Sequence, residues 1–160
     1  MDIYSFSFYI NSSNHIFVDC IVFYVKRRSD INWNGDLSIL KDYVIGTTLG
    51  WSYGEAFDQI KSTLHIYTVN DICTNFKKLM VGRVDMVPTT YRNGLACIEA
   101  FNLQNKVVML SPDIQDINGY IGFSKQPKLS NFKRLFNARL KQMIDNGTVS
   151  LINNKYQLQY

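Results

Sequence analysis

The chain has 160 residues, of which 46% are hydrophobic and 14% aromatic, so it can bury the core of one domain or of two unequal lobes. Only 19% of its residues are charged and it has no low-complexity segment, which argues against disorder over most of its length. The net charge is +4, and the basic residues are scattered over separate predicted elements: Lys26-Arg27-Arg28, Lys77-Lys78, Lys133-Arg134 and Lys141. We therefore expect solvated faces and no nucleic-acid interface.

The three cysteines form neither a CxxC pair nor a cluster with histidine. Cys20, Cys73 and Cys97 each lie among apolar neighbours and their number is odd, so we expect buried small hydrophobic residues rather than a disulfide framework. The N-terminal segment MDIYSFSFYI lacks the basic start of a signal peptide, so we expect no export signal. The most apolar run, Ile16 to Val25, is interrupted by Asp19 and is too short to span a bilayer. These patterns predict a soluble chain.

The first half of the chain predicts strands that alternate with helices. His15 to Lys26 is rich in Ile, Val, Phe and Tyr on both alternating faces, which is typical of a strand covered on both sides. Asp36 is placed to cap a short helical turn, and Asn70 to cap an amphipathic helix that Gly82 ends. Between them we expect a strand at Tyr43–Gly46, a Gly-rich turn, a helix from about Ser52 to Lys61 and a strand at Leu64–Tyr67.

The second half continues the alternation. The expected elements are a strand from Arg83 to Val87, a helix from Arg92 to Phe101, strands at Lys106–Leu110 and Gly119–Ser124, a long helix capped by Ser130 and ended by Gly147, and a short helix from about Val149 to Lys155. Strands that alternate with helices predict α/β layers around a largely parallel sheet.

The segment GTTLGWSYGEAF, Gly46 to Phe57, is the first candidate site. If a helix begins in it, free backbone N–H groups and the helix dipole favour a carboxylate or a phosphate. Its glycines permit close approach of the backbone, and three hydroxyls add donors: those of Thr47, Thr48 and Ser52. The alternative is that Thr48 and Ser52 only cap the helix, and Trp51 is either a cleft aromatic residue or a surface residue.

The segment VPTTYRN, Val87 to Asn93, is the second candidate site. It follows a predicted strand at the carboxyl end, where α/β sheets commonly bind ligands. Thr89 and Thr90 would offer hydroxyls, whereas Tyr91 either faces the cleft or simply starts the next helix.

The sequence gives little support for catalysis. His15 and His65 are each next to apolar strand residues, and no HExxH, GxSxG or P-loop spacing occurs. Asp113 and Asp116 lack the spacing of a calcium loop. We therefore expect no enzyme activity, no metal and no cofactor.

Four segments together, from about Asn14 to Tyr156, resemble the family 3 extracellular solute-binding proteins, the periplasmic amino-acid-binding components of ABC transporters. HIFVDCIVFYVKR is similar to the strand that crosses into the family's second lobe, and DLSILKDYVIGTTLGWSYGEAF to the segment with its Gly-rich turn. NFKKLMVGRVDMV resembles the helix that ends at Gly-Arg before a strand, and YIGFSKQPKLSNFKRLFNARLKQMIDNGTVSLINNKY resembles the return segment.

The resemblance implies an α/β, type II periplasmic-binding-protein-like fold with one complete lobe and a partial first lobe. Residues 1–27 would be the crossing strand and the remnant of the first lobe, 28–118 the second lobe, and 119–160 the return strand and C-terminal helices. It also implies a ligand cleft that Gly50, Trp51 and Ser52 line, a small polar or anionic amino-acid-like ligand, an ABC permease as partner and a periplasmic location.

Two departures from the family pattern limit this expectation. The first lobe, which in the family supplies an aromatic stack and a carboxylate-binding arginine, has no counterpart beyond about a dozen residues. The family's amine-binding aspartate falls on Thr90, whose neutral hydroxyl cannot supply the charge that pairs with an ammonium. The alternative function is an interaction module without a transport ligand, which self-associates or swaps a segment through the apolar face of the return helix: Phe132, Leu135, Phe136 and Leu140.

Overall fold

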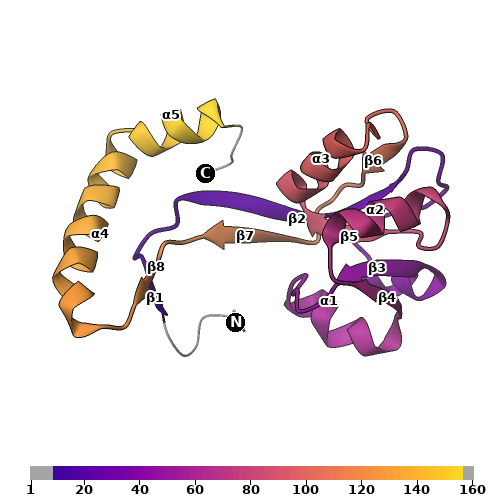
Figure 1. Ribbon diagram of the computed structural model, residues 1–160, viewed down its shortest axis with the longest axis horizontal. Coiled ribbons are helices and arrows are strands. Elements are labelled where there is room, and N and C mark those ends of the chain that lie inside the picture. Colours follow the sequence, from indigo (N-terminus) through magenta and orange to yellow (C-terminus); the bar gives the residue numbers. More distant parts are fainter. Residues whose placement is uncertain (1–8, 157–160) are drawn as a thin grey trace. The chain divides into compact units, whose positions relative to one another are not determined.

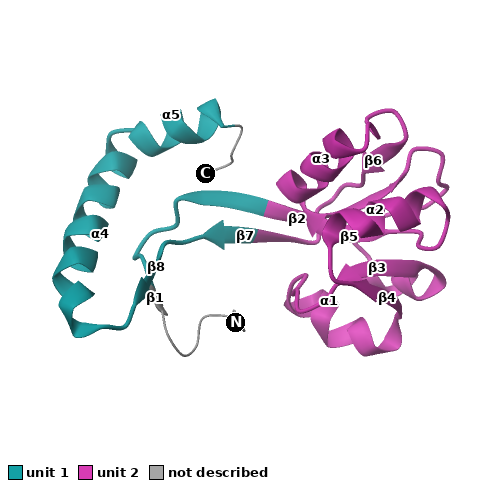
Figure 2. Ribbon diagram, in the orientation of Figure 1, with its two compact units in different colours: residues 1–19, 117–160 teal, residues 20–116 magenta. Residues whose placement is uncertain are grey.

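The computed structural model describes residues 9–156, which form two compact units (Figure 2). Unit 1 comprises Met1–Asp19 and Ile117–Tyr160, and unit 2 comprises Cys20–Asp116. Most of the N-terminal segment for which no export signal is expected lies outside the described residues. None of the described helices is long and apolar enough to cross a membrane.

Unit 2 is built on a mixed sheet with helices packed against it (Figure 1). Its strands are β2 (Phe17–Lys26, whose first residues belong to unit 1), β3 (Val44–Thr48), β4 (His65–Val69), β5 (Val87–Thr90) and β6 (Val107–Met109). β3 and β4 are parallel, and a parallel bridge between Ile45 and Met86 joins β3 to the segment that enters β5. β2 runs antiparallel to both β5 and β6, and also pairs with β7 (Gln115–Gly119). The predicted α/β class is confirmed.

The helical elements of unit 2 are η1 (Leu37–Asp42), α1 (Glu55–Ile60), η2 (Lys61–Thr63), α2 (Ile72–Met80) and α3 (Tyr91–Ala100). Asp36 caps η1 as predicted, because its carboxylate accepts a bond from the Ser38 N–H. The predicted cap of α2 is wrong by one residue: Asp71, not Asn70, accepts a bond from the Thr74 N–H at 2.8 Å. A carboxylate in that position also complements the positive end of the helix dipole.

The core of unit 2 contains Tyr24, whose ring is 1% exposed and packs against α2 and α3. Phe76 of α2 lies 5.4 Å from this ring between centroids. On the α3 side, Gly94 leaves room for the ring, because a Cβ at this position would lie 2.0 Å from Tyr24 Cε2. The Tyr24 hydroxyl donates to the Tyr91 carbonyl at 2.8 Å, which fixes the ring in this place.

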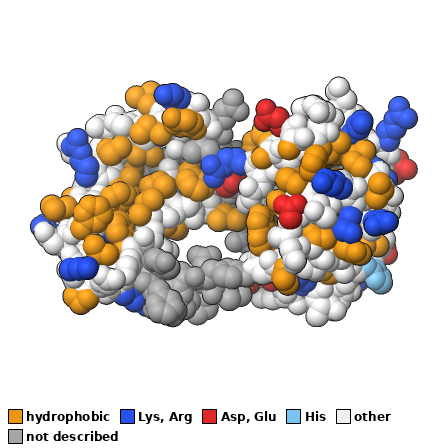
Figure 3. Space-filling view, viewed as in Figure 1, with side chains coloured by type: hydrophobic (Ala, Val, Ile, Leu, Met, Phe, Trp, Pro, Cys, Tyr) orange, Lys and Arg blue, Asp and Glu red, His pale blue; other side chains and the backbone are white. Residues whose placement is uncertain are grey.

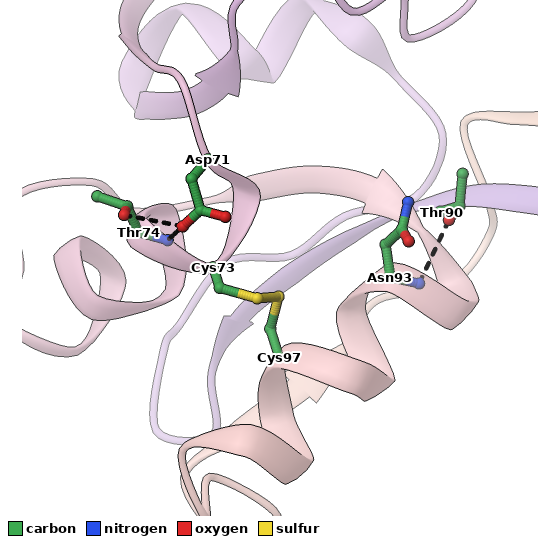
Figure 4. Close-up of a disulfide and its surroundings, with 6 residues drawn as sticks. All are labelled: Asp71, Cys73, Thr74, Thr90, Asn93 and Cys97. Carbon is green, nitrogen blue, oxygen red and sulfur yellow. Dashed lines mark hydrogen bonds between the residues drawn. A yellow bond between two sulfur atoms is a disulfide. The ribbon is translucent and has the colours of Figure 1, made fainter.

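A disulfide joins Cys73 of α2 to Cys97 of α3, so the prediction of buried free cysteines is wrong for these two (Figure 4). The two helices pack against each other, which brings the Cα atoms to 5.2 Å, well within the range that a disulfide spans. Cys20 is not part of a disulfide and is half-buried. The pairing depends on how α2 and α3 pack, and a separation of 24 residues without a motif gives no sign of it in the sequence.

The elements described in unit 1 are β1 (Tyr9–Asn11), the end of β7, β8 (Gly122–Ser124), η3 (Pro127–Leu129), α4 (Ser130–Asp145) and α5 (Thr148–Lys155). β1 and β8 form an antiparallel pair. Ser130 is the first residue of α4 and not its cap, since Leu129 precedes the helix without a side-chain bond. Gly147, at φ 77°, separates α4 from α5.

The apolar face of α4 is only partly covered. Leu140 is buried, and Phe123 of β8 packs edge-on against Phe136 at 5.2 Å between ring centroids. Phe132 and Leu135 are 58% and 53% exposed. The expected exposed apolar face therefore exists at its N-terminal part.

Candidate ligand-binding site

The corner that follows β3 differs from the predicted strand–turn–helix arrangement. α1 begins at Glu55, three residues after the predicted start at Ser52, and it has only six residues. Gly54, at φ 103°, precedes it, a backbone conformation that favours glycine. The free helix N-terminus that was expected near Gly50–Ser52 is therefore absent from the described corner.

Three donors of this corner already have partners within the chain. The Ser52 hydroxyl donates to the Asp58 carboxylate, and the Tyr53 N–H donates to the same carboxylate at 3.2 Å. The Trp51 N–H donates to the Thr48 carbonyl at 3.2 Å, which closes a turn at Gly50. Asp58 thus holds the corner from the first helical turn, and this is the physical reason why the helix starts late. Gly50, Trp51 and Ser52 remain exposed to solvent.

Thr47 and Thr48 end β3, and their hydroxyls differ in whether they have a hydrogen-bond partner. The Thr47 hydroxyl lies 3.0 Å from the Thr68 hydroxyl, so it joins β3 to β4. The Thr48 N–H donates to the Tyr53 hydroxyl at 2.6 Å. Burial raises the pKa of Tyr53 above its usual range, and the bond from Thr48 opposes this only in part. The Thr48 hydroxyl oxygen is buried and has no partner within the described chain.

The second candidate segment brings a similar hydroxyl to the end of β5. Thr89 is 1% exposed, and its hydroxyl oxygen has no partner among the described residues. Thr90 caps α3, because its hydroxyl accepts a bond from the Asn93 N–H at 3.4 Å (Figure 4). Tyr91 is the first residue of α3, and its carbonyl accepts the bond from Tyr24. Thr90 is therefore already engaged, whereas Thr89 is not.

Thr48 and Thr89 lie at matching positions of two neighbouring parallel segments. Ile45 and Met86 form a parallel bridge, and the Gly46 N–H donates to the Met86 carbonyl at 2.8 Å. Thr48 lies three residues beyond Ile45, and Thr89 three residues beyond Met86. Side chains at matching positions of parallel strands face the same side, so both hydroxyls belong to the face of the sheet that carries α2.

A third orphaned polar atom lies on this face. Asn75 of α2 is fully buried, and its amide donates to the Thr47 carbonyl at 3.0 Å. Its carbonyl oxygen has no partner in the described chain and lies 2.8 Å from the position that a Cβ would take at Gly46. The glycine is needed here for close packing of helix on strand rather than for ligand approach. The amphipathic spacing of α2 does not predict that Asn75 is a buried polar residue of this face.

A cavity of about 160 Å³ lies in unit 2, and Gly54 is one of the residues that line it. Its lining consists of Trp33, Gly35, Leu37, Gly54, Ala56, Phe57, Asp113, Ile114 and Gln115. The Gln115 side-chain oxygen accepts a bond from the Glu55 N–H at 3.2 Å, so the first N–H of α1 is occupied. A hydrogen bond from Asp113 raises the pKa of the neighbouring Asp116 carboxyl. Gly54, Ala56 and Phe57 belong to the first candidate segment, whereas the other lining residues are not expected at a site, because the lining assembles only when the segments 33–37, 54–57 and 113–115 fold together.

The other titratable candidates do not assemble into a centre. Within residues 9–156, no group of three or more His, Cys, Asp or Glu side chains could hold a metal ion. His15 lies edge-on to Tyr120 at 6.2 Å between ring centroids, and His65 is exposed at the start of β4.

The chain is similar to known proteins in its structure, whereas comparison of its sequence finds no match. No protein-family model matches the chain, and no curated protein matches it. A mutant of ArgBP from T. maritima matches with a TM-score of 0.71 and 15% sequence identity, covering 92% of this chain and 61% of that one. The GluR0 ligand-binding core from Nostoc punctiforme in complex with L-glutamate matches at 0.68 and 20%, covering 92% and 64%.

A third solved structure concerns glutathione import through GshT and the cystine ABC importer TcyBC of Streptococcus mutans. It matches with a TM-score of 0.70 and 19% identity, covering 92% of this chain and 62% of that chain. The chain thus spans less than two thirds of the length of each of these three structures. Since nearly all of the chain superimposes, it has the fold of the type II periplasmic binding proteins, with one complete lobe and part of the other.

Proposed function

We propose that the chain is a non-catalytic solute-binding domain, which binds a small polar or anionic, amino-acid-like ligand as part of transport or sensing. The GluR0 core holds L-glutamate and GshT takes part in glutathione import, and both carry the same fold as this chain. The ligand would bind at the carboxyl ends of β3 and β5, where sheets of this kind commonly hold small molecules.

The observation that carries the proposal is the pair of unpartnered hydroxyls of Thr48 and Thr89. These residues are 3% and 1% exposed, and both hydroxyl oxygens lack a partner among the described residues. A buried polar group without a partner costs about 1–3 kcal/mol, so a ligand group or an ordered water that bonds to it is favoured. α3 begins at Tyr91, two residues after Thr89, and its first backbone N–H groups with the helix dipole favour a carboxylate.

The ligand chemistry follows from Thr90. This residue stands where the resemblance places an amine-binding aspartate, and its hydroxyl already caps α3. A neutral hydroxyl supplies no charge to pair with an ammonium. We therefore expect a carboxylate to contribute more to binding than an α-amino group does. Trp51, Ser52 and Tyr91 would lie at the rim of the site, where Trp51 is 36% exposed.

Binding by these 160 residues is expected to be weak. They include only part of one of the two lobes, so they can make only some of the contacts that two complete lobes make with a ligand, and they do not enclose it. Calorimetric titration with L-glutamate, L-arginine, glutathione and simple dicarboxylates should give a Kd on the order of 0.1–1 mM for at least one of them. Thr89→Val keeps the side-chain shape and removes the hydroxyl, so it should weaken that binding about five- to tenfold.

Thr63→Val is the matched control, since Thr63 is exposed in η2 and its hydroxyl donates to the Ile60 carbonyl. It should leave the Kd unchanged. The absence of heat for every compound, or an equal loss in both variants, would contradict the proposal.

The proposed function also includes a cellular location and a protein partner. A periplasmic or extracellular location and an ABC permease as partner agree with the importer context of GshT. The Cys73–Cys97 disulfide supports the location, since structural disulfides persist in oxidising compartments.

The alternative function, a self-associating interaction module, rests on α4. Phe132 and Leu135 expose an apolar face that a second copy of the chain could cover. Under this alternative, sedimentation equilibrium should show a dimer whose population rises with concentration, and Phe132→Ser with Leu135→Ser should convert it to monomer. A monomer at every concentration would remove this alternative.

A further inference from the structure

Six basic side chains that are scattered in the sequence come together at one end of unit 2. We call them the basic surface: Lys26, Arg27, Lys77, Lys78, Arg83 and Lys106. Unit 2 carries ten basic and ten acidic residues, so a group of six basic residues is a strong local departure from neutrality. Blue Lys and Arg side chains with orange hydrophobic side chains between them are visible over unit 2 in Figure 3.

Contacts between neighbouring elements connect the members of the basic surface. The Arg83 N–H donates to the Lys78 carbonyl at 2.9 Å, and the Arg27 N–H donates to the Lys106 carbonyl at 2.8 Å. The Lys26 ammonium lies 3.6 Å from the position that a Cβ would take at Gly82. These contacts bring the end of β2, the segment before β6 and the C-terminal end of α2 to one surface.

The charges of the basic surface are not neutralised within the chain. Among residues 9–156, no carboxylate forms an ion pair with any of the six. The acidic residues closest to them in sequence are Asp85, whose carboxylate accepts a bond from the Val44 N–H at 2.8 Å, and Asp30. Lys77 and Lys78 lie in the last turn of α2, where they complement the helix dipole. That explanation does not extend to Lys26, Arg27 and Lys106, which lie on or beside β2 and β6.

Apolar side chains stand among these charges. Val81, the residue that ends α2, is 69% exposed, and Tyr67 of β4 is 43% exposed. The Lys78 ammonium lies 4.1 Å from the centre of the Tyr67 ring, and its hydrogen bond and charge lower the pKa of Tyr67. Exposed apolar residues surrounded by Lys and Arg are typical of surfaces that bind an anionic lipid headgroup layer, where the apolar groups enter the interface. An exposed valine can enter a lipid interface, whereas it adds nothing to the recognition of an acidic protein.

We propose that the basic surface of unit 2 binds the anionic phospholipid surface of a membrane, with Val81 at the centre of the contact. Each Lys or Arg near such a surface contributes about 1 kcal/mol, and the contribution falls with ionic strength. Six of them can hold the domain reversibly at a membrane without a spanning helix. This surface does not depend on the ligand site, because none of its residues belongs to that site.

The test is co-sedimentation of the whole chain with vesicles of phosphatidylglycerol and phosphatidylcholine, compared with vesicles of phosphatidylcholine alone. The chain should bind the anionic vesicles at about 0.05 M salt and be released at about 0.5 M. Lys77→Glu with Lys78→Glu should weaken binding by more than about tenfold. The matched control, Lys125→Glu with Lys128→Glu, makes the same change in net charge on exposed residues of unit 1 and should weaken it by less than about threefold.

Unchanged thermal unfolding of the variants shows that folding is not the cause of the loss. Failure to bind anionic vesicles, or an equal loss in both variants, overturns the proposal. Retention of the chain by polyglutamate but not by the vesicles also overturns it, because the basic surface then recognises acidic protein.

Discussion

Removal of the Cys73–Cys97 disulfide is expected to lower the free energy of unfolding of unit 2 by about 3 kcal/mol. The bond closes a loop of 24 residues between α2 and α3, and it restricts the unfolded chain by a loop-closure term of this size. The variant to measure is Cys73→Ala with Cys97→Ala, by urea unfolding monitored by tryptophan fluorescence. Reduction of the unmodified chain should give a similar loss, since it removes the same restriction without a substitution.

Cys20→Ala is the control, because Cys20 is half-buried and is not part of the disulfide. It should cost less than about 1.5 kcal/mol, and reduction should still destabilise this variant. Mass spectrometry after alkylation of the unfolded, unreduced chain should find one free thiol of three. Three free thiols, or equal stability with and without reductant, would contradict the disulfide and the support it gives to an oxidising location.

Gly94→Ala is expected to destabilise unit 2 by about 3 kcal/mol, although the same change in a helix exposed to solvent stabilises by up to about 1 kcal/mol. The new Cβ would lie 2.0 Å from Tyr24 Cε2 and 2.2 Å from Cζ. The ring is fully buried and its hydroxyl is bonded to the Tyr91 carbonyl, so it cannot move aside without losing this bond. Destabilisation by Gly94→Ala would therefore indicate close packing against Tyr24, whereas stabilisation would indicate that helix propensity dominates.

Asn93→Ala is the control for this prediction, since Asn93 is an exposed neighbour in the same helix. It should change the free energy of unfolding by less than about 0.5 kcal/mol. In the Tyr24→Leu background, Gly94→Ala should cost much less, because the ring that it meets is gone. A neutral or stabilising effect of Gly94→Ala in the unmodified chain would show that Tyr24 does not occupy this position.

Much of the fold could be predicted from patterns along the chain. The strand at 15–26, the helix after Asp71 and the long helix near 130–145 are specified by local periodicity and caps, and the structure has them at nearly those positions. The predicted strand 119–124 contains β8, but β7 (Gln115–Gly119) lies almost entirely before it and could not be predicted, because β7 depends on β2 as its pairing partner. The late start of α1 has a similar cause, since Asp58 draws the Ser52 and Tyr53 donors into the turn.

The candidate site could be predicted only in part. The sequence predicts Thr48 and Thr89 as site residues from their place in two strand–turn segments, but their common face follows from the Ile45–Met86 bridge, which joins segments 41 residues apart. The same pattern predicts Thr47, Ser52 and Thr90, and the structure gives their hydroxyls partners inside the chain. The sequence predicts scattered charge in place of the basic surface, because the members of this surface lie on elements that only the folded sheet brings together.

The central claim is that the carboxyl ends of β3 and β5 bind a small amino-acid-like ligand. The most direct measurement is a ¹H–¹⁵N NMR titration of the whole chain with L-glutamate, L-arginine and glutathione in turn. With at least one of them, saturable amide shifts should be confined to residues 48–53 and 89–93, and Thr89→Val should reduce them. Shifts elsewhere in the chain, or none with any compound at millimolar concentration, would contradict the claim.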